Sequence, residues 1–225
     1  MDTSGNALNY NGTSWSETNI DGTNSLSSVS CASSIYCVGV DNNGNALTYN
    51  GTSWTSSNID GTTPLSSISC PSTTLCYAVD SGGNILTEGS TNWQVTNVEE
   101  DSLTAISCPS STYCVMGDDR GNVFTDSSGT ISGPTSVFFG PIVSISCYSS
   151  SFCGAVDSGS QASIDANGTW SSIDFSTYSS GLYSFMTTLT SISCYSSTNC
   201  ITIDQKDDNA SYSPGTWSAT QKLDE

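Results

Sequence analysis

The sequence predicts an all-β protein, a β-propeller of five four-stranded blades with one disulfide in each blade. Ten cysteines form five pairs with the same spacing, C-x5-C. The first cysteines of successive pairs lie 39, 38, 39 and 47 residues apart, so one structural unit is repeated along the chain. Each unit contains four short segments of β-type pattern, and no segment looks like a long helix. The pairs are Cys31 and Cys37, Cys70 and Cys76, Cys108 and Cys114, Cys147 and Cys153, and Cys194 and Cys200.

The second unit shows the expected order of strands and turns. The expected strands are 65–70 (a), 76–80 (b), 85–88 (c) and 93–98 (d). Strand a alternates apolar and polar residues, and strand b is small and apolar enough to be buried on both faces. The a–b turn is expected at 71–75, and Asp80-Ser-Gly-Gly-Asn predicts a hairpin turn with glycine at positive φ. Directly opposed residues at the ends of a and b would be close enough for a disulfide.

The other units follow this template as parts of a single domain, 1–225. We expect blades at approximately 25–62, 63–101, 102–140, 141–187 and 188–221. Residues 1–24 match strands c and d without strands a and b. Three explanations stay open: the chain is taken from a longer repeat array, the hairpin closes the ring by replacing the weak strands of 209–220, or it pairs with another subunit. Six blades, one of them incomplete, are the alternative to five.

Composition restricts the function. The net charge is −18 with three cationic residues, which argues against binding to nucleic acids. No apolar run is long enough to span a bilayer, so no membrane insertion is expected. The absence of histidine excludes Ser-His-Asp and Cys-His catalysis. Paired cysteines indicate disulfides in an oxidising compartment, extracellular or at the cell surface, since zinc sites usually have closer spacings.

Short motifs carry a resemblance to a known family. The segments SISCPSTTLCYAVDSGGNILT and TYNGTSW resemble the repeats of Asp-box (BNR-like) propellers, closest to the photosystem II assembly-factor kind and to Ser/Thr-rich secreted bacterial propellers. The resemblance covers nearly the whole chain and implies the propeller fold. The family's Asp in the c–d turn is replaced by Asn11, Asn50 and Asn167. Some relatives are sialidases with an arginine triad, which the single Arg120 cannot supply.

Acidic residues open the turns between strands b and c. Because strand direction alternates, these turns share one face with the d–a loops, and we expect an acidic ring there that includes Asp21 and Asp60. Calcium prefers such oxygen ligands, although Asp also opens turns by accepting a backbone hydrogen bond. We favour the turn role and no cofactor, and expect raised pKa values wherever two carboxyl groups approach each other. The calcium candidates are Asp41, Asp80, Asp118 and Asp157.

Aromatic residues supply the candidate ligand sites. Tyr10 and Tyr49, beside Asn11 and Asn50, could stack on sugars, while the tryptophans that open strand d could equally pack between blades. The loop 174–188 is the longest insertion and either contacts a partner or covers a blade. Its aromatic candidates are Phe175, Tyr178, Tyr183 and Phe185. Four N-x-S/T sequons begin at Asn11, Asn50, Asn167 and Asn209.

These observations favour a secreted, non-catalytic binding or adhesion module, possibly lectin-like, whose partner is a glycan or an extracellular protein. The alternative is a structural subunit of an extracellular assembly or filament, with self-association through residues 1–20. A glycosidase is the third possibility, because paired carboxylates can hydrolyse glycosides. It is disfavoured because the acidic residues repeat in every unit, whereas a catalytic pair should break the repeat.

Overall fold

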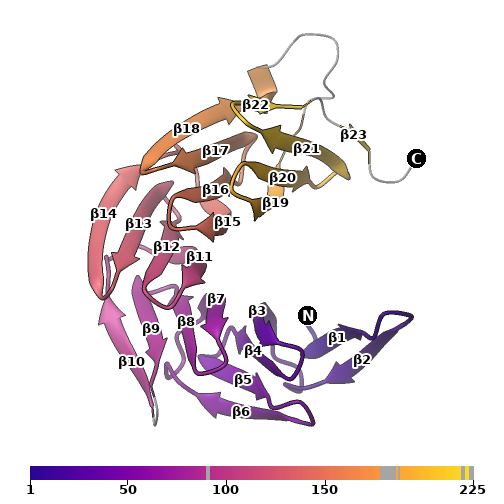
Figure 1. The fold of residues 1–225 in the computed structure, drawn as a ribbon. Coiled ribbons are helices and arrows are strands. Elements are labelled where there is room, and N and C mark those ends of the chain that lie inside the picture. The colour runs from indigo at the N-terminus through magenta and orange to yellow at the C-terminus, as the bar shows by residue number, and fades with distance from the viewer. Residues whose placement is uncertain (90–91, 178–185, 187, 219–220, 223–225) are drawn as a thin grey trace. The chain divides into compact units, whose positions relative to one another are not determined.

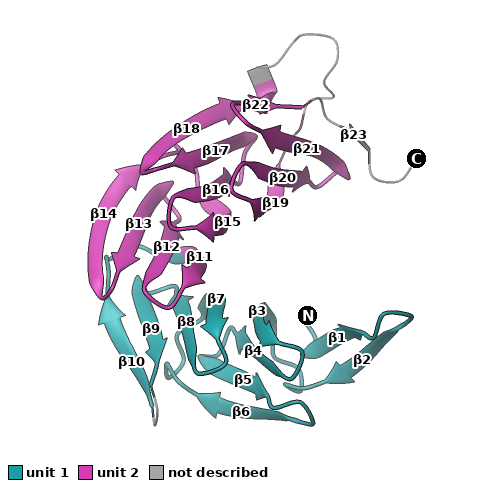
Figure 2. Ribbon diagram, viewed as in Figure 1, with its two compact units in different colours: residues 1–103 teal, residues 104–225 magenta. Residues whose placement is uncertain are grey.

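The computed structural model describes residues 1–225 except 90–91, 178–185, 187, 219–220 and 223–225 (Figure 1). It is built from strands, and its one helical element is the 3-10 turn η1 (Phe175–Thr177). No helix in these described ranges is long and apolar enough to cross a membrane. The chain divides into two compact units, residues 1–103 and 104–225 (Figure 2), and each unit is described by itself.

Unit 1 contains a two-stranded hairpin followed by two four-stranded antiparallel sheets. The hairpin is β1 (Asn6–Tyr10) and β2 (Trp15–Asn19). The first sheet is β3 (Leu26–Ser33), β4 (Tyr36–Asp41), β5 (Asn45–Tyr49) and β6 (Trp54–Asn58). The second sheet is β7 (Leu65–Ser72), β8 (Leu75–Asp80), β9 (Asn84–Glu88) and β10 (Trp93–Asn97).

The third to fifth sheets repeat the same strand order. The third is β11 (Leu103–Ser110), which begins at the boundary between the units, β12 (Tyr113–Asp118), β13 (Asn122–Ser127) and β14 (Thr130–Ser136). The fourth is β15 (Ile142–Ser149), β16 (Phe152–Asp157), β17 (Gln161–Ala166) and β18 (Thr169–Asp174). The fifth is β19 (Leu189–Ser196), β20 (Asn199–Asp204), β21 (Asp208–Ser213), β22 (Thr216–Trp217) and β23 (Gln221–Lys222). Repeated four-stranded sheets are therefore confirmed, whereas closure into a ring of five blades stays a prediction.

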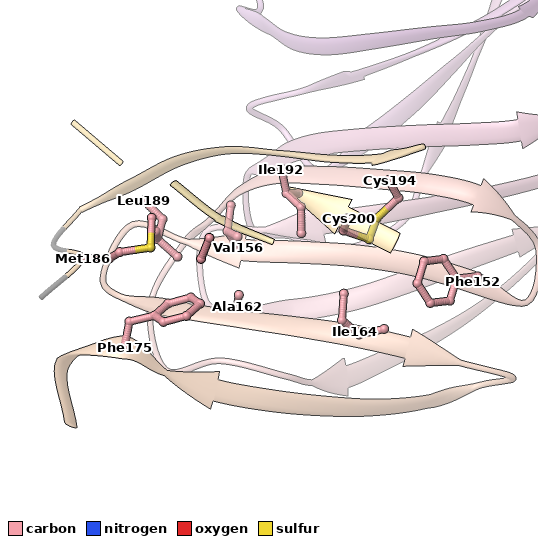
Figure 3. Close-up of a cluster of buried hydrophobic side chains, with 11 residues drawn as sticks. Phe152, Val156, Ala162, Ile164, Phe175, Met186, Leu189, Ile192, Cys194 and Cys200 are labelled. Atoms are coloured by element: carbon pink, nitrogen blue, oxygen red, sulfur yellow. A yellow bond between two sulfur atoms is a disulfide. The ribbon is translucent and has the colours of Figure 1, made fainter. Parts of the chain in front are cut away.

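Apolar side chains fill the space between neighbouring sheets of the same unit. Val38 and Ala46 of the first sheet pack with Ala78 and Leu86 of the second. A similar cluster joins the third and fourth sheets, and Figure 3 shows the one that joins the fourth and fifth. Burial is greatest in the second strand of each sheet and least in the fourth, as in β8 and β10. The second strand is thus the centre of the core, as its small apolar residues predict.

All five predicted disulfides form, with Cα–Cα separations between 3.9 and 4.1 Å. They suggest an oxidising environment. The predicted a–b turn is too long, however, because β7 continues to Ser72 and β8 already begins at Leu75. In the first sheet, Cys31 lies directly opposite Cys37, and the ladder resumes at Ser33 and Tyr36 after a register shift. This irregularity lets the strands continue past the disulfide.

Serine and threonine hydroxyls connect the first strands of neighbouring sheets. The Ser27 hydroxyl donates to the carbonyl oxygen of Leu65 at 2.6 Å, and Ser30 accepts the backbone N–H of Cys70 at 2.9 Å. The same contact recurs from Cys147 to Ser107 at 3.0 Å and from Cys194 to Ser146 at 2.9 Å. A strand at the edge of a sheet otherwise leaves its backbone groups unpaired. The hydroxyl-rich composition therefore has a structural use in these hydroxyl seams.

Glycine is required in the b–c turn of the second sheet, as predicted. The carbonyl of Gly83 accepts the backbone N–H of Val98 at 2.9 Å, and its φ is +77°. A Cβ at this position would overlap the carbonyl oxygen of Glu99. Gly61 also has positive φ, +61°, but a Cβ there would meet no atom within 4 Å.

We expect Gly83→Ala to lower the free energy of unfolding by more than about 2 kcal/mol, because steric overlap adds to left-handed strain. The matched Gly61→Ala variant meets only the strain, roughly 1–2 kcal/mol. Urea unfolding of both variants measures the difference. Equal losses would show that the overlap is relieved without cost.

Candidate functional site

Three tyrosine–tryptophan pairs occupy the same place in the repeat. In each pair, a tyrosine near the end of the third strand lies opposite a tryptophan of the fourth strand, and the ring centroids lie 5.1–5.4 Å apart. These pairs are Tyr10 and Trp15, Tyr49 and Trp54, and Tyr212 and Trp217. The second, third and fourth sheets have other residues at this place, namely Glu88 and Trp93, Asp126 and Ile131, and Asp165 and Trp170. The repeated pair thus gives three similar aromatic surfaces.

The two predicted ligand sites, at the turns that follow β1 and β5, differ in exposure. Trp15 is 68% exposed and Tyr10 is 52% exposed, whereas Tyr49 is half-buried. The Asn11 side-chain oxygen accepts the backbone N–H groups of Thr13 and Ser14, both at 2.9 Å. Asn50 does the same for Thr52 and Ser53, both at 3.0 Å. Both asparagines therefore shape their turns, and the rings of the first pair are the more exposed to solvent.

The third pair lines a groove of about 760 Å³ between the outer strands of the fourth and fifth sheets. Tyr212 and Trp217 come from β21 and β22, and Ser171 from β18. No charged side chain contributes. The other lining residues are Ile164, Ala166, Thr169, Ser172, Ile173, Gly215 and Thr216. Sequence reasoning missed this site because it treated the strands of 209–220 as weak, although Tyr212 and Trp217 align with Tyr49 and Trp54.

A smaller groove of about 350 Å³ lies between the hairpin and the first sheet. Leu8, Val29, Tyr49 and Trp54 are among its lining residues. Leu8 and Val29 are unusually exposed for large apolar residues. The surface thus resembles an incomplete contact between repeats.

The long insertion behaves differently from the prediction of an exposed aromatic site. Phe175 is 3% exposed and packs edge-on against Trp217, with ring centroids 5.4 Å apart. Met186 is buried in the same cluster, shown in Figure 3. Both ends of the insertion are therefore anchored in the core, and Phe175 is wrong as a ligand-contacting residue. The candidates Tyr178, Tyr183 and Phe185 lie outside the described residues.

The aspartates of the b–c turns are structural. Asp41 is fully buried, and one of its oxygens accepts the backbone N–H groups of Asn43 and Asn45 at 2.9 and 2.7 Å. Its other oxygen accepts the Asn45 side-chain amide at 2.7 Å. Asp80 and Asp118 repeat these contacts, and Asp157 repeats the backbone ones.

These carboxylates therefore have the turn role that the sequence favoured over calcium binding. Among the residues whose positions the structure gives, no group of three or more acidic, Cys or His side chains could hold a metal ion. The calcium hypothesis thus has no structural support in this part of the chain.

Carboxyl groups of neighbouring repeats do approach each other in unit 1. Burial, and then the Asp41 carboxyl, raises the pKa of Asp21 to about 6. Burial and Asp80 raise the pKa of Asp60 to about 6 in the same way. One oxygen of each raised carboxyl is buried and has no hydrogen-bond partner. The predicted rise in pKa where aspartates meet is confirmed for both.

A tyrosine also contacts an acid of the next repeat. The Tyr36 hydroxyl donates to Glu88 at 3.0 Å. Burial, followed by this carboxylate, raises the pKa of Tyr36 to about 12. Burial and Asp165 raise the pKa of Tyr113 in the equivalent place of unit 2. These contacts are part of the packing between repeats.

Comparisons with known proteins identify the fold. No family model and no curated protein match the sequence. A chain in the crystal structure of the mitotic checkpoint complex aligns with a TM-score of 0.79 at 10% identity, over 96% of this chain and 71% of that one. YCF48 bound to D1 peptide gives 0.67 at 16% identity, over 89% and 68%. U3-55K gives 0.71 at 11%, over 86% and 64%.

These proteins are propeller-like, so the chain has a β-propeller repeat fold. It spans about two thirds of the length of the chains it matches. At these identities the similarity shows the fold alone. The finer assignment to the Asp-box type stays a prediction.

Proposed function

We propose that the protein is a secreted, non-catalytic binding module that recognises neutral glycans in the groove between the fourth and fifth sheets. The observation that carries the proposal is the lining of this groove. It combines two aromatic rings, Tyr212 and Trp217, with serine and threonine hydroxyls, and none of its described lining residues is charged. The whole chain carries a net charge of −18.

This lining matches the chemistry of a sugar. A pyranose ring has an apolar face that stacks on Trp or Tyr, and its hydroxyls exchange hydrogen bonds with neutral side chains. The hydroxyls of Thr169, Ser171 and Thr216 line the groove beside the rings. No cationic side chain is present there to bind phosphate or sulfate. The exposed Tyr10 and Trp15 offer a second, weaker surface of the same kind, and two linked sites would raise avidity.

The same lining supports a role without catalysis. Glycoside hydrolysis needs two carboxyl groups on either side of the scissile bond. Among the described residues that line the groove, none carries a carboxyl group. We therefore propose binding and not hydrolysis.

A charge placed in the groove tests the proposal. Ser171 is an exposed residue of β18, and Ser132 is the equivalent exposed residue of β14 in the third sheet. A glycan array identifies the best neutral ligand, and titration calorimetry measures its affinity. We expect Ser171→Glu to weaken binding roughly tenfold or more, because an unpaired carboxylate would have to be desolvated. A tenfold loss of affinity corresponds to about 1.4 kcal/mol of binding free energy. Ser132→Glu should bind like the unmodified protein.

Two results would contradict glycan binding at this site. One is an array without any neutral ligand. The other is an equal affinity of the two variants for the ligand found.

A further inference from the structure

The outer edge of β1 is an unfilled position of the repeat. Residues 5–15 and 44–54 differ at one position, Asn9 against Thr48. β5 lies between β4 and β6, whereas β1 pairs only with β2 in the described part of the chain. Leu47 is consequently 0% exposed, but the matching Leu8 is 47% exposed. Since the two segments are almost identical, this difference arises from the missing neighbour strand.

The fifth sheet has all its strands, but the residues of its outer strands differ from those of the other repeats. Its third strand, β21, carries Asn209 and Ala210 where β5 has Ala46 and Leu47. Asp207 takes the turn position of Gly44 and adopts a φ of +65°. Glycine adopts this left-handed conformation without strain, whereas aspartate adopts it only occasionally.

The fourth strand of this sheet is also weak. It is divided into β22 and β23, each of two residues and each paired with β21. In the first sheet, the matching strand β6 has five residues. The outer half of the fifth sheet is thus the part least like the repeat.

We propose that the hairpin β1–β2 of one copy of the protein replaces β21–β23 of a second copy and pairs with its strand β20. In the first sheet, Val40 lies opposite Ala46 and Val38 opposite Thr48. The same register places Ile203 opposite Ala7 and Ile201 opposite Asn9.

The exchange restores the residues of the ordinary repeat. Gly5 takes the place of Asp207 in the turn. Leu8 takes the place of Ala210, which is a fully buried member of the cluster shown in Figure 3. Tyr10 and Trp15 replace Tyr212 and Trp217, so the aromatic pair is kept. Leu8 and β1 would then lose the exposure that they have in the single chain.

This association is head-to-tail. A copy that donates its hairpin still carries its own fifth sheet, which can accept the hairpin of another copy. Repetition of this contact gives an open chain, or a ring if the rotation closes. The exchange would also replace Tyr212, Thr216 and Trp217 in the groove of the accepting copy by Tyr10, Ser14 and Trp15 of the donor.

Sedimentation velocity of the full chain, from low micromolar to millimolar concentration, tests the exchange. We expect the particle mass to rise with concentration in multiples of 23.4 kDa. Leu8→Asp should shift association to concentrations higher by roughly tenfold or more, because a charge cannot enter the apolar cluster. Val95→Asp is the control, since Val95 of β10 is 50% exposed and lies outside the hairpin.

A converse variant improves the acceptor's own strand. Asp207→Gly, Asn209→Ala and Ala210→Leu together should make β21 a better partner for β20 and suppress association. The proposal is overturned if the unmodified protein remains at 23.4 kDa at every concentration. It is equally overturned if the Leu8 and Val95 variants associate alike. A monomer in which Leu8→Asp alone lowers thermal stability would indicate closure within one chain.

Discussion

Refolding without disulfides is expected to fail. Each bridge joins cysteines that are six positions apart, and closing such a loop stabilises the folded state by about 2 kcal/mol. Five bridges contribute about 10 kcal/mol, which is comparable with the whole stability of an ordinary domain, about 5–15 kcal/mol. The test is to unfold the protein, reduce it, and follow refolding by near-ultraviolet circular dichroism with and without reductant. We expect native ellipticity to return only when the cysteines can reoxidise.

Removal of one bridge separates the contribution of a single repeat. The double variant Cys70→Ala and Cys76→Ala should keep the fold and lower the free energy of urea unfolding by about 2 kcal/mol. The same protein with all bridges intact is the control. Full recovery of native ellipticity in reductant would show that packing between repeats suffices without the disulfides.

Stability is expected to increase when the pH falls from neutral to about 5. Asp21 and Asp60 have pKa values of about 6 in the folded protein, against an ordinary value of 3.8. The folded state therefore holds more protons than the unfolded state between these values, and its stability falls as the pH rises through this window. Each carboxyl pair should cost about 1 kcal/mol at pH 7 after solvent screening is taken into account. Urea unfolding at pH 5 and pH 7.5 measures the effect.

The double variant Asp21→Asn and Asp60→Asn should be more stable than the unmodified protein at pH 7.5 and should flatten this dependence. Asp119→Asn removes an exposed carboxyl from the turn between β12 and β13 of the third sheet, and it is the matched control. Below pH 4 a separate effect opposes the gain. Asp174 has a lowered pKa, chiefly through its hydrogen bond with Ser176, and its stabilisation is lost on protonation. A stability that rises steadily from pH 5 to pH 7.5 would contradict the proposed role of the two carboxyl pairs.

The repeat could be predicted because its signals are local. Cysteine spacing, alternating strands and glycine in the b–c turns each depend on a few consecutive residues, and all recur in the structure. The a–b turn could not be placed because a register shift beside the disulfide lets the strands run further than the alternation indicates. Local pattern favoured the turn role of Asp41, but it could not show that the carboxylate is fully buried.

Burial between repeats was the less predictable part of the site. Phe175 lies in a long insertion, where sequence suggests exposure, yet the fifth sheet covers it. Leu8 and Leu47 have almost identical sequence surroundings and opposite exposure. The groove of Tyr212 and Trp217 arises because the residues of β21 and β22 do not fill the space that other repeats fill. Such features depend on which repeat lies beside a residue, and spacing along the chain does not encode this.

The hydroxyl seams have a consequence for how such a chain can change in evolution. Each seam joins a serine to a backbone group one repeat further on, and the acceptor or donor in that next repeat is main chain. Main-chain groups are the same for every amino acid, so a seam needs no matched pair of side chains. Duplication or loss of a whole repeat would therefore create a new junction that already fits. As far as the seams are concerned, tandem copying of a repeat needs no compensating substitution in the neighbouring repeat.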